Sequence, residues 1–301
     1  MAKKVLICNP VAEEAVEMLE DAGLEVEKEF GMSKEELTEK VPPYHALVVR
    51  SSTKVREPTI DAAENLKVIG RPGIGLDNID LDYAEEKGIA VYNTPTATTI
   101  SVAELTMTHI LASYRDIVAG TNSLRNGEWI KSELASNEIH GKTLGIVGYG
   151  NIGQAVAERA DAFGMDILAF DVLDIEEPEP STMVDMDELF KKSDIITIHV
   201  PHNEATHHLI SSEELEKMKD DAVLVDCSRG GVVDKDALYD ALKNEMIRFA
   251  SKDVFAEEPP EDNPLLTLDN FHATPHIGAQ TEEGQIRAGT QAAEKIIDEL
   301  K

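Results

Sequence analysis

The chain has 301 residues, of which 42% are hydrophobic and only 5% aromatic, so it is long enough for two packed domains of ordinary size. It carries 58 acidic and 28 basic residues. The formal net charge of -30 excludes nucleic acid and anionic membranes as partners, because both are bound through clusters of lysine and arginine. The acidity indicates either a very soluble surface or adaptation to a cytoplasm rich in salt, where screening relieves the self-repulsion.

Residues 4–8 form the first predicted strand. Their apolar run ends at Asn9 and Pro10, too early for an export signal, and no later run approaches the ~18 apolar residues that span a bilayer. The two cysteines, Cys8 and Cys227, lie in strand-like runs without metal-ligand spacing. We therefore expect a protein of the reducing cytoplasm with no structural metal.

Strands and helices alternate through the first part of the chain, as in parallel βαβ units. The predicted strands are 4–8, 46–50, 68–70 and 90–92, and the predicted helices are 12–22, 59–65 and 82–87. We expect residues 1–96 to form one small domain of the flavodoxin-like type. Residues 280–301, which hold the last predicted helix, complete that domain.

A long helix is predicted over residues 101–121, with Ser101 as its N-cap and Glu104 completing a capping box. A second series of strands follows, near 143–147, 166–170, 195–199, 222–226, 248–254 and 271–273. These strands, with helices between them, predict a Rossmann domain over residues 97–279. The predicted fold class is thus α/β, with two doubly wound parallel sheets and a cleft between the two domains.

The turn at residues 148–153 has the pattern Gly-x-Gly-x-x-Gly between a predicted strand and a predicted helix. Gly148 permits a tight turn, Gly150 lets the backbone approach a pyrophosphate, and Gly153 allows the helix to pack closely on the strand. The next strand ends in Asp171, whose carboxylate suits two ribose hydroxyls and repels a 2'-phosphate. NAD is therefore favoured over NADP. The alternative is a glycine turn without a ligand beside a solvated acid.

Three polar residues follow later strands: Arg229, Glu258 and His276. Ligands of an open parallel sheet bind at the carboxyl ends of its strands, so these side chains are candidates for one site. An imidazole can take the proton of a substrate hydroxyl, and a carboxylate can orient that imidazole. An arginine fork can bind a substrate carboxylate at two points. Taken singly, each could instead be a turn or surface residue.

Four motifs in order resemble the D-isomer-specific 2-hydroxyacid dehydrogenase family: the glycine turn with Asp171, Cys-Ser-Arg-Gly-Gly, Asp-Val-Phe-x-Glu-Glu-Pro and Pro-His-Ile-Gly. The resemblance covers essentially the whole chain. It implies a catalytic triad of Arg229, Glu258 and His276 and a hydride transfer between substrate C2 and NAD. It also implies a homodimer, with the bridging helix region at the interface. The residues that it implies for the cofactor, besides the three glycines, are Asn151, Ile152, Asp171, Val200, Cys227, Ser228, Asp253, Gly278 and Ala279.

Within the family, residues 49–55, 70–80 and 92–95 resemble the members that act on 3-phosphoglycerate. The small-molecule substrate expected from this is a phosphorylated hydroxy acid, oxidised by NAD with His276 as the base in the first step of serine synthesis. Arg50 and Arg71, scarce cations at predicted strand ends, would neutralise its phosphate, with Lys131 assisting from a neighbouring subunit. They could also be surface arginines in ion pairs. The remaining expected substrate contacts are Ser51, Gly73, Ile74, Gly75 and Arg229.

Two departures from the family pattern bear on these expectations. Lys252 stands where an apolar residue is usual, which predicts a strand exposed on one face and leaves the placement of Asp253 open. The sequence ends at Lys301, so we expect no regulatory domain and no inhibition by serine within this chain. Two other functions remain open: a glyoxylate or hydroxypyruvate reductase, which needs no phosphate clamp, and an NAD-sensing binding protein that retains the triad.

Overall fold

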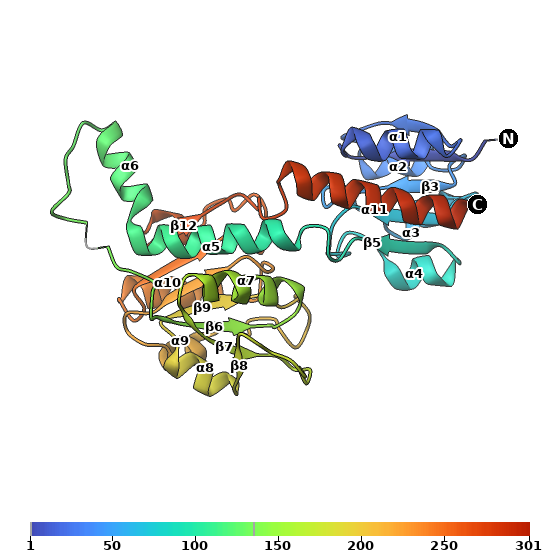
Figure 1. Ribbon diagram of the computed structural model, residues 1–301. Coiled ribbons are helices and arrows are strands. Elements are labelled where there is room, and N and C mark those ends of the chain that lie inside the picture. Colours follow the sequence, from blue (N-terminus) through green and yellow to red (C-terminus); the bar gives the residue numbers. More distant parts are fainter. Residues whose placement is uncertain (1, 135) are drawn as a thin grey trace. The chain divides into compact units, whose positions relative to one another are not determined.

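The computed structural model describes residues 2–134 and 136–301, which fold into two compact α/β units (Figure 1). The first unit, here called the split unit, joins the segment that ends at Thr99 to Ala279–Lys301, and the second, the continuous unit, spans Ile100–Gly278. Every strand pairing in both sheets is parallel. The predicted fold class of two parallel-sheet α/β domains is confirmed.

The sheet of the split unit has five strands in the order β2-β1-β3-β4-β5, which is the flavodoxin-like order. The strands are β1 (Lys4–Ile7), β2 (Glu25–Lys28), β3 (Ala46–Val48), β4 (Val68–Arg71) and β5 (Ala90–Asn93). Sequence reasoning missed β2, because its residues Glu-Val-Glu-Lys are largely exposed and show no apolar run. An edge strand with a single apolar side chain gives little hydrophobic signal.

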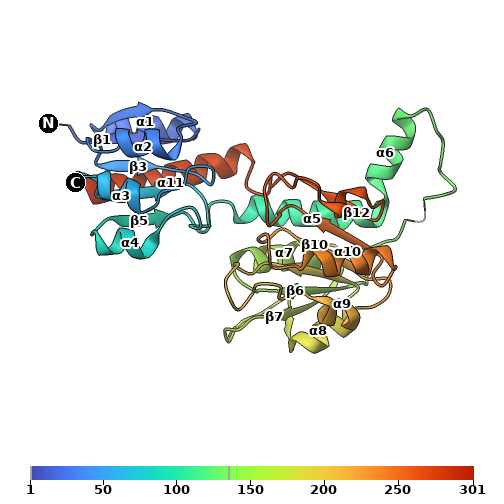
Figure 2. The same ribbon diagram turned by 180° about the vertical axis from the view of Figure 1, so that it is seen from behind.

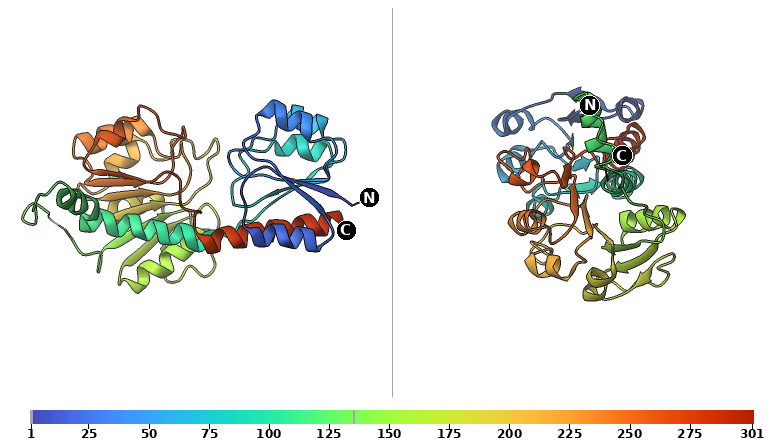
Figure 3. Two further views of the ribbon diagram at one scale, coloured as in Figure 1. Left: turned by 90° about the horizontal axis from the view of Figure 1, so that it is seen from above. Right: turned by 90° about the vertical axis from the view of Figure 1, so that its left-hand side faces the viewer.

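Helices cover both faces of this sheet (Figure 3). On one face lie α1 (Glu13–Asp21) and α11 (Glu282–Leu300), whose Leu19 and Ile296 pack in the same apolar cluster. Opposite them, Leu37 and Ile60 share a second cluster. The helices of that face are α2 (Lys34–Lys40), α3 (Glu57–Ala62) and α4 (Leu81–Glu86). The returning helix α11 thus completes a core that the first part of the chain begins.

The continuous unit has seven strands in the order β12-β11-β10-β9-β6-β7-β8. They are β6 (Thr143–Val147), β7 (Asp166–Phe170), β8 (Thr182–Met183), β9 (Ile195–Ile198), β10 (Val223–Asp226), β11 (Phe249–Lys252) and β12 (Phe271–Ala273). Six of these were predicted, and the seventh, β8, is a two-residue edge strand. The strand order reverses between β6 and β9, and this is the position where doubly wound sheets bind ligands.

Helices α5 (Thr99–Arg115) and α7 (Asn151–Ala162) pack on one face of this sheet through Ile110 and Val156. The other face carries α8 (Met186–Lys192), α9 (Ser212–Lys217) and α10 (Lys235–Lys243), with Leu189, Leu215 and Leu238 in one cluster. A short 3-10 helix, η1 (Pro264–Thr267), precedes β12. No helix of the described residues is long and apolar enough to cross a membrane.

The predicted helix over residues 101–121 is wrong in two respects. It begins earlier, at Thr99, so Ser101 is a buried residue inside α5 and the capping box with Glu104 does not exist. It also breaks at Asp116, which has a φ of 49°, and a separate helix α6 (Ile117–Arg125) follows. Aspartate tolerates the left-handed conformation better than most residues, so the chain turns there although its apolar pattern continues.

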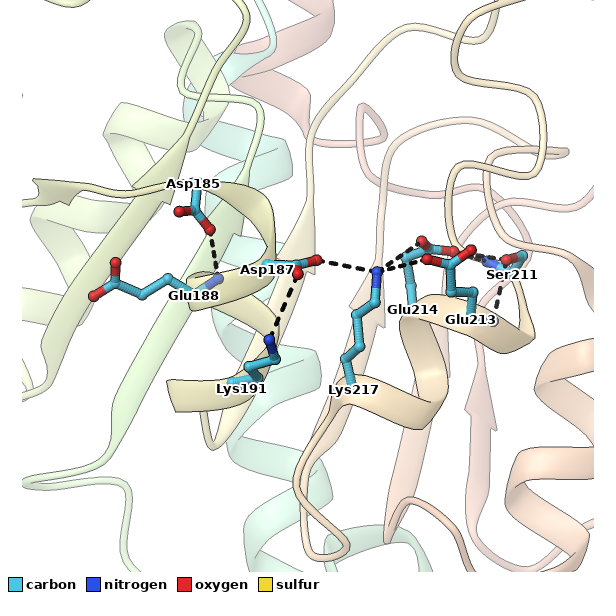
Figure 4. A network of polar contacts seen from close by, with 8 residues as sticks. All are labelled: Asp185, Asp187, Glu188, Lys191, Ser211, Glu213, Glu214 and Lys217. Carbon is cyan, nitrogen blue, oxygen red and sulfur yellow. Dashed lines mark hydrogen bonds and ion pairs between the residues drawn. The ribbon is translucent and has the colours of Figure 1, made fainter.

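Helices α8 and α9 lie side by side and are joined by ion pairs (Figures 2 and 4). Lys217 of α9 binds Asp187 of α8 and Glu213 of its own helix, both at 3.0 Å, and lies 3.7 Å from Glu214. These contacts raise the pKa of Lys217 and lower the pKa of Asp187. One cation is therefore shared by three carboxylates.

Candidate active site

The glycine turn leads from β6 into α7 at the point where the strand order reverses. Gly148 has a φ of 94°, and a Cβ there would lie 2.6 Å from the carbonyl oxygen of His199. A Cβ on Gly153 would overlap the carbonyl oxygen of Gly148, whereas one on Gly150 would meet no described atom within 4 Å. The first and third glycines are thus required by packing, and the second leaves open space beside the backbone.

Among the described residues, no side chain caps the N-terminus of α7 at Gly150. The first N–H groups of this helix, including those of Asn151 and Ile152, therefore point out of the helix toward the open side of the turn. Such a terminus, with its positive dipole, binds phosphate oxygens. The turn thus fits the pyrophosphate of a dinucleotide.

Asp171 follows β7 and is held against the glycine turn. Its Oδ2 accepts a hydrogen bond of 2.7 Å from the Tyr149 backbone N–H, and its Oδ1 accepts one of 3.0 Å from Leu173 N–H. Each carboxylate oxygen keeps a second lone pair for a hydroxyl donor. The Tyr149 ring is buried, and its hydroxyl donates to the Pro178 carbonyl at 2.7 Å. Tyr149, which sequence reasoning missed, anchors the turn.

Two predicted cofactor residues lie on neighbouring strand ends. Val200 follows β9, and its Cγ1 would lie 2.9 Å from a Cβ on Gly148, so it borders the glycine turn. Cys227 follows β10 and is buried, and burial raises the pKa of its thiol. A buried protonated thiol behaves as a small apolar side chain rather than as a nucleophile.

His276 and Glu258 contact each other directly. The Nδ1 of His276 lies 2.8 Å from Glu258 Oε2 and 3.0 Å from Oε1, and Oε1 also accepts the Phe255 N–H at 3.1 Å. Because a carboxylate only accepts, the imidazole proton resides on Nδ1. The Nε2 lone pair of His276 is then available for a substrate proton. Both side chains are well exposed, with relative accessibilities of 43% and 39%, so a small molecule can reach them.

Arg229 follows β10, and its Nη1 donates to the Ser228 carbonyl at 2.8 Å. A Cβ on Gly230 would overlap the carbonyl of Phe255, so this glycine lets the Arg229 loop approach the segment that leads to Glu258. The three predicted catalytic residues therefore stand at the carboxyl ends of three adjacent strands, β10, β11 and β12.

Lys252 corrects a sequence expectation. All four residues of β11 are buried, so the strand is not exposed on one face. The Lys252 side chain pairs with Asp226, the residue opposite it on β10, at 2.8 Å. The other oxygen of Asp226 accepts the Ser228 N–H at 3.0 Å and the Ser228 hydroxyl at 2.6 Å. This buried pair therefore holds the residue that precedes Arg229.

Asp253 follows Lys252 and is buried. Its carboxylate accepts the backbone N–H groups of Ile277 and Gly278, both at 2.8 Å, and the Thr274 hydroxyl at 2.6 Å. The carboxylate thus holds the turn around His276. Ala279 already belongs to the split unit, where its carbonyl accepts a hydrogen bond from the side chain of Gln285.

In the split unit, the predicted substrate residues lie at the carboxyl ends of β3 and β4, which are neighbours in the sheet. Arg50 Nη1 donates to the Pro10 carbonyl at 3.3 Å, and burial lowers the pKa of Arg50. Arg71 ends β4, and a Cβ on Gly73 would overlap its guanidinium. Gly73 also has a φ of 137°, so glycine is required there both by the nearby guanidinium and by the backbone conformation.

The loops around these arginines are held by hydrogen bonds with side chains of other segments. The Arg50 N–H donates to Asn9 at 2.7 Å, and Ser51 follows in an exposed turn. Thr94 Oγ1 accepts the Gly73 N–H at 2.7 Å, so this N–H is already used within the loop. The segment of Ile74 and Gly75 is held through the Ile74 carbonyl, which accepts from Asn93 at 2.6 Å. The expected binding of a carboxylate by these N–H groups stays a prediction.

Known proteins resemble the chain over nearly all of its length. The family described as D-isomer specific 2-hydroxyacid dehydrogenase, NAD binding domain, matches residues 107–278. A D-3-phosphoglycerate dehydrogenase of Methanocaldococcus jannaschii is 52% identical over 99% of this chain and 57% of its own length. A hydroxypyruvate reductase of Thermotoga maritima is 49% identical over 99% of this chain and 98% of its own length. The chain therefore spans just over half of the first of these relatives and nearly all of the second.

Solved structures share this fold. A protein of Thermus thermophilus superposes with a TM-score of 0.93 at 36% identity, covering 99% of this chain and 96% of that one. A D-lactate dehydrogenase of Aquifex aeolicus, solved with NAD and lactic acid, gives 0.86 at 29% identity, covering 98% and 94%.

Proposed function

Because the chain belongs to the D-isomer specific 2-hydroxyacid dehydrogenase family and carries its NAD-binding domain, we propose that it oxidises D-3-phosphoglycerate to 3-phosphohydroxypyruvate with NAD. The observation that carries this choice of substrate is the pair Arg50 and Arg71 at neighbouring strand ends, with Gly73 leaving room for the second guanidinium. The name of the 52% identical relative supports it. The reaction would begin the synthesis of serine in a cytoplasmic pathway.

In the proposed reaction, His276 Nε2 takes the proton of the C2 hydroxyl while the hydride leaves C2. NAD⁺, when bound, accepts that hydride. Glu258 keeps the Nδ1 proton in place and stabilises the imidazolium that forms, as its contact of 2.8 Å allows. Arg229 binds the substrate carboxylate and the C2 oxygen, where its planar fork matches two acceptors. The reverse reduction uses the same groups with His276 as the acid.

Arg50 and Arg71 would bind the phosphate at the far end of the substrate. A guanidinium remains charged at every working pH, and its fork suits phosphate oxygens. Both are cations in a chain with a net charge of -30, so each would supply positive charge to a dianionic phosphate in an otherwise acidic protein.

A second candidate function is a hydroxypyruvate reductase. The specific observation in its favour is the 49% identical relative of that name, whose length this chain matches almost completely. Such an enzyme needs the triad but no phosphate clamp, so the two candidates make opposite predictions for the arginines of the split unit.

Steady-state kinetics with NAD and NADP on 3-phosphoglycerate, glycerate, lactate, glyoxylate and hydroxypyruvate test the proposal. We expect Arg50→Gln to raise the KM for 3-phosphoglycerate about 10- to 150-fold, because a hydrogen bond to a charged group is worth about 1.5–3 kcal/mol. The KM for hydroxypyruvate should stay within about twofold. The matched control is Arg56→Gln, since Arg56 is an arginine of the same unit that bonds the Asp77 carbonyl.

Two results would favour the reductase. One is an equal kcat/KM for phosphorylated and unphosphorylated substrates in the wild type. The other is a KM for 3-phosphoglycerate in Arg50→Gln that is no higher than in Arg56→Gln. Binding of NAD without turnover of any of these substrates would favour an NAD-sensing protein.

We further propose a homodimer that covers α6 and the loop after it. Ile117, Leu124 and Trp129 are 59%, 60% and 79% exposed there, and α6 stands beyond the end of α5 (Figure 1). Such a group of exposed apolar side chains is typical of a protein interface. Trp129→Glu should lower the mass in sedimentation equilibrium to that of a monomer, whereas Phe163→Glu, at another exposed aromatic, should not. A dimer that persists in Trp129→Glu contradicts this interface.

A further inference from the structure

A row of polar side chains runs through the interior of the continuous unit from β11 to the turn that carries His276. His109 of α5 is only 5% exposed, and its Nδ1 lies 2.6 Å from the hydroxyl of Ser251, which is fully buried. Its Nε2 lies 3.0 Å from the Thr274 hydroxyl, which is 2.6 Å from Asp253 Oδ1. The four residues come from α5, β11, the residue after β11, and the residue after β12.

The Asp253 end of this row holds the backbone on both sides of His276. Thr274 lies two residues before His276, and the N–H groups of Ile277 and Gly278 follow it, each 2.8 Å from the carboxylate. His276 itself has a φ of 53°, a left-handed conformation that is unfavourable for a residue with a side chain. The contacts to Asp253 on either side stabilise that conformation, so its geometry depends on where Asp253 lies.

The direction of each hydrogen bond follows from the chemistry of the groups. A carboxylate only accepts, so the single hydroxyl proton of Thr274 goes to Asp253. The Thr274 oxygen must then accept from His109, which places a proton on His109 Nε2. Burial lowers the pKa of His109, so the ring is neutral and its Nδ1 carries no proton. Nδ1 therefore accepts from the Ser251 hydroxyl, and all three bonds point toward Asp253.

We propose that His109 is a positioning residue for the reaction, acting through Thr274 and Asp253 on the turn that presents His276. The Nε2–H form fixes the Thr274 rotamer, because it is the only neutral form of the ring that donates to Thr274 while the Thr274 hydroxyl donates to Asp253. An apolar side chain at this position would leave the Ser251 hydroxyl and the Thr274 oxygen without that partner, and buried polar groups without a partner are unfavourable. The proposal rests on the proposed role of His276 as the base.

The first test needs no turnover. In protein labelled with ¹⁵N-histidine, long-range ¹H–¹⁵N spectra distinguish the two neutral tautomers and the cation. His109 is identified as the signal that His109→Gln lacks. We expect a protonated Nε2 and an unprotonated Nδ1 at pH 7–8, above the usual pKa of a histidine. A protonated Nδ1, or a doubly protonated ring, would overturn the hydrogen-bond chain. This result is independent of which substrate the enzyme uses, so it also stands if the proposed function fails.

The second test asks whether the chain reaches His276. The ¹⁵N signals of His276 should move in His109→Leu and return toward the wild-type positions in His109→Gln, whose side-chain amide can still donate to Thr274. The matched control is Ser113→Ala. Ser113 is a buried hydroxyl one turn along α5 that bonds only the His109 carbonyl among the described contacts. His276 signals that are the same in His109→Leu and wild type would refute the positioning role without reference to activity.

Kinetics give the third readout. We expect His109→Leu and Thr274→Val each to lower kcat at least about tenfold and to change its pH profile, since ~1 Å of misplacement at a reacting group costs about 100-fold. The double variant should be no slower than the worse single variant, because both break one chain. If His109→Leu melts earlier but keeps the wild-type kcat and pH profile, the residue is only structural. If His109→Leu does not fold, the same comparison of melting temperature with kcat and its pH profile is made with Thr274→Val and His109→Gln.

Discussion

Replacing Lys252 by methionine should destabilise the continuous unit strongly. Methionine keeps the apolar stem but removes the ammonium group that lies 2.8 Å from Asp226, a carboxylate with no exposed surface. Removing one partner of a buried ion pair costs about 3–5 kcal/mol, because the other charge stays buried. The lower value is expected here, since Ser228 still donates two hydrogen bonds to Asp226. About 3 kcal/mol corresponds to a fall in Tm on the order of 6–12 °C for a unit of this size.

Urea unfolding followed by circular dichroism measures this loss. Two further variants show whether the loss of stability comes from the broken pair of Lys252 and Asp226. Lys252→Met with Asp226→Asn removes both charges and should return to within about 1 kcal/mol of the wild type, because neutral replacement of a buried pair is often nearly neutral in stability. Lys235→Met breaks an exposed pair of 3.7 Å with Asp236 and should cost less than about 1 kcal/mol. A double variant no more stable than Lys252→Met would refute the reasoning, as would wild-type stability in Lys252→Met.

Three other outcomes follow from the site and its surroundings. Asp171→Ala should raise the KM for NAD about 10-fold or more and narrow the preference for NAD over NADP, because a charge-assisted hydrogen bond of about 1.5–3 kcal/mol is lost. An unchanged ratio of the two KM values counts against a ribose contact. Gly73→Ala, which places a methyl group against the Arg71 guanidinium, should impair turnover of 3-phosphoglycerate more than of hydroxypyruvate, and equal losses on both substrates would argue against a phosphate clamp. Burial lowers the pKa of His199 from 6.5 to about 4, so the unfolded chain binds a proton that the folded one does not, and stability is lost as the pH falls from about 6.5 to 4. In His199→Gln the urea midpoint should therefore depend less on pH between pH 7 and 5 than in the wild type, and an unchanged pH dependence would contradict the burial argument.

The sequence was sufficient for the fold class because both sheets are built from local strand and helix patterns in a regular order. The glycine turn is predictable for the same reason: strand, turn, helix and Asp171 lie within one βαβ unit. Arg229, Glu258 and His276 were placed at strand ends by the alternation alone, and adjacency of the three strands follows from the doubly wound order. Their chemical roles stay predictions.

The failures came from features that local patterns do not encode. The break in the bridging helix depends on one backbone conformation at Asp116, which the apolar periodicity does not reveal. Lysine is normally a surface residue, so burial of Lys252 could be found only through its partner. A signal existed nevertheless: Asp226 and Lys252 are the last residues of consecutive parallel strands, and equal register places them opposite each other.

His109 shows more clearly what sequence patterns cannot predict. It lies among apolar residues on a helix, where a histidine is usually a core residue without a special role. Its partner Thr274 is far along the chain and on another element, so only the tertiary structure brings the imidazole to the hydroxyl. The role proposed for His109 depends on a chain of hydrogen bonds, and the spacing of residues along the sequence does not predict such a chain.

The split unit draws its core from both ends of the described chain, because Ile296 and Leu300 of α11 pack with Val5 and Ile7 of β1. A ribosome delivers the first strands early and α11 only after the whole continuous unit has been synthesised. The NAD-binding domain can therefore fold as soon as it emerges, whereas the apolar face beneath α1 waits for the last helix. During synthesis the nascent chain therefore acquires a place for the coenzyme before the first-made strands complete their core.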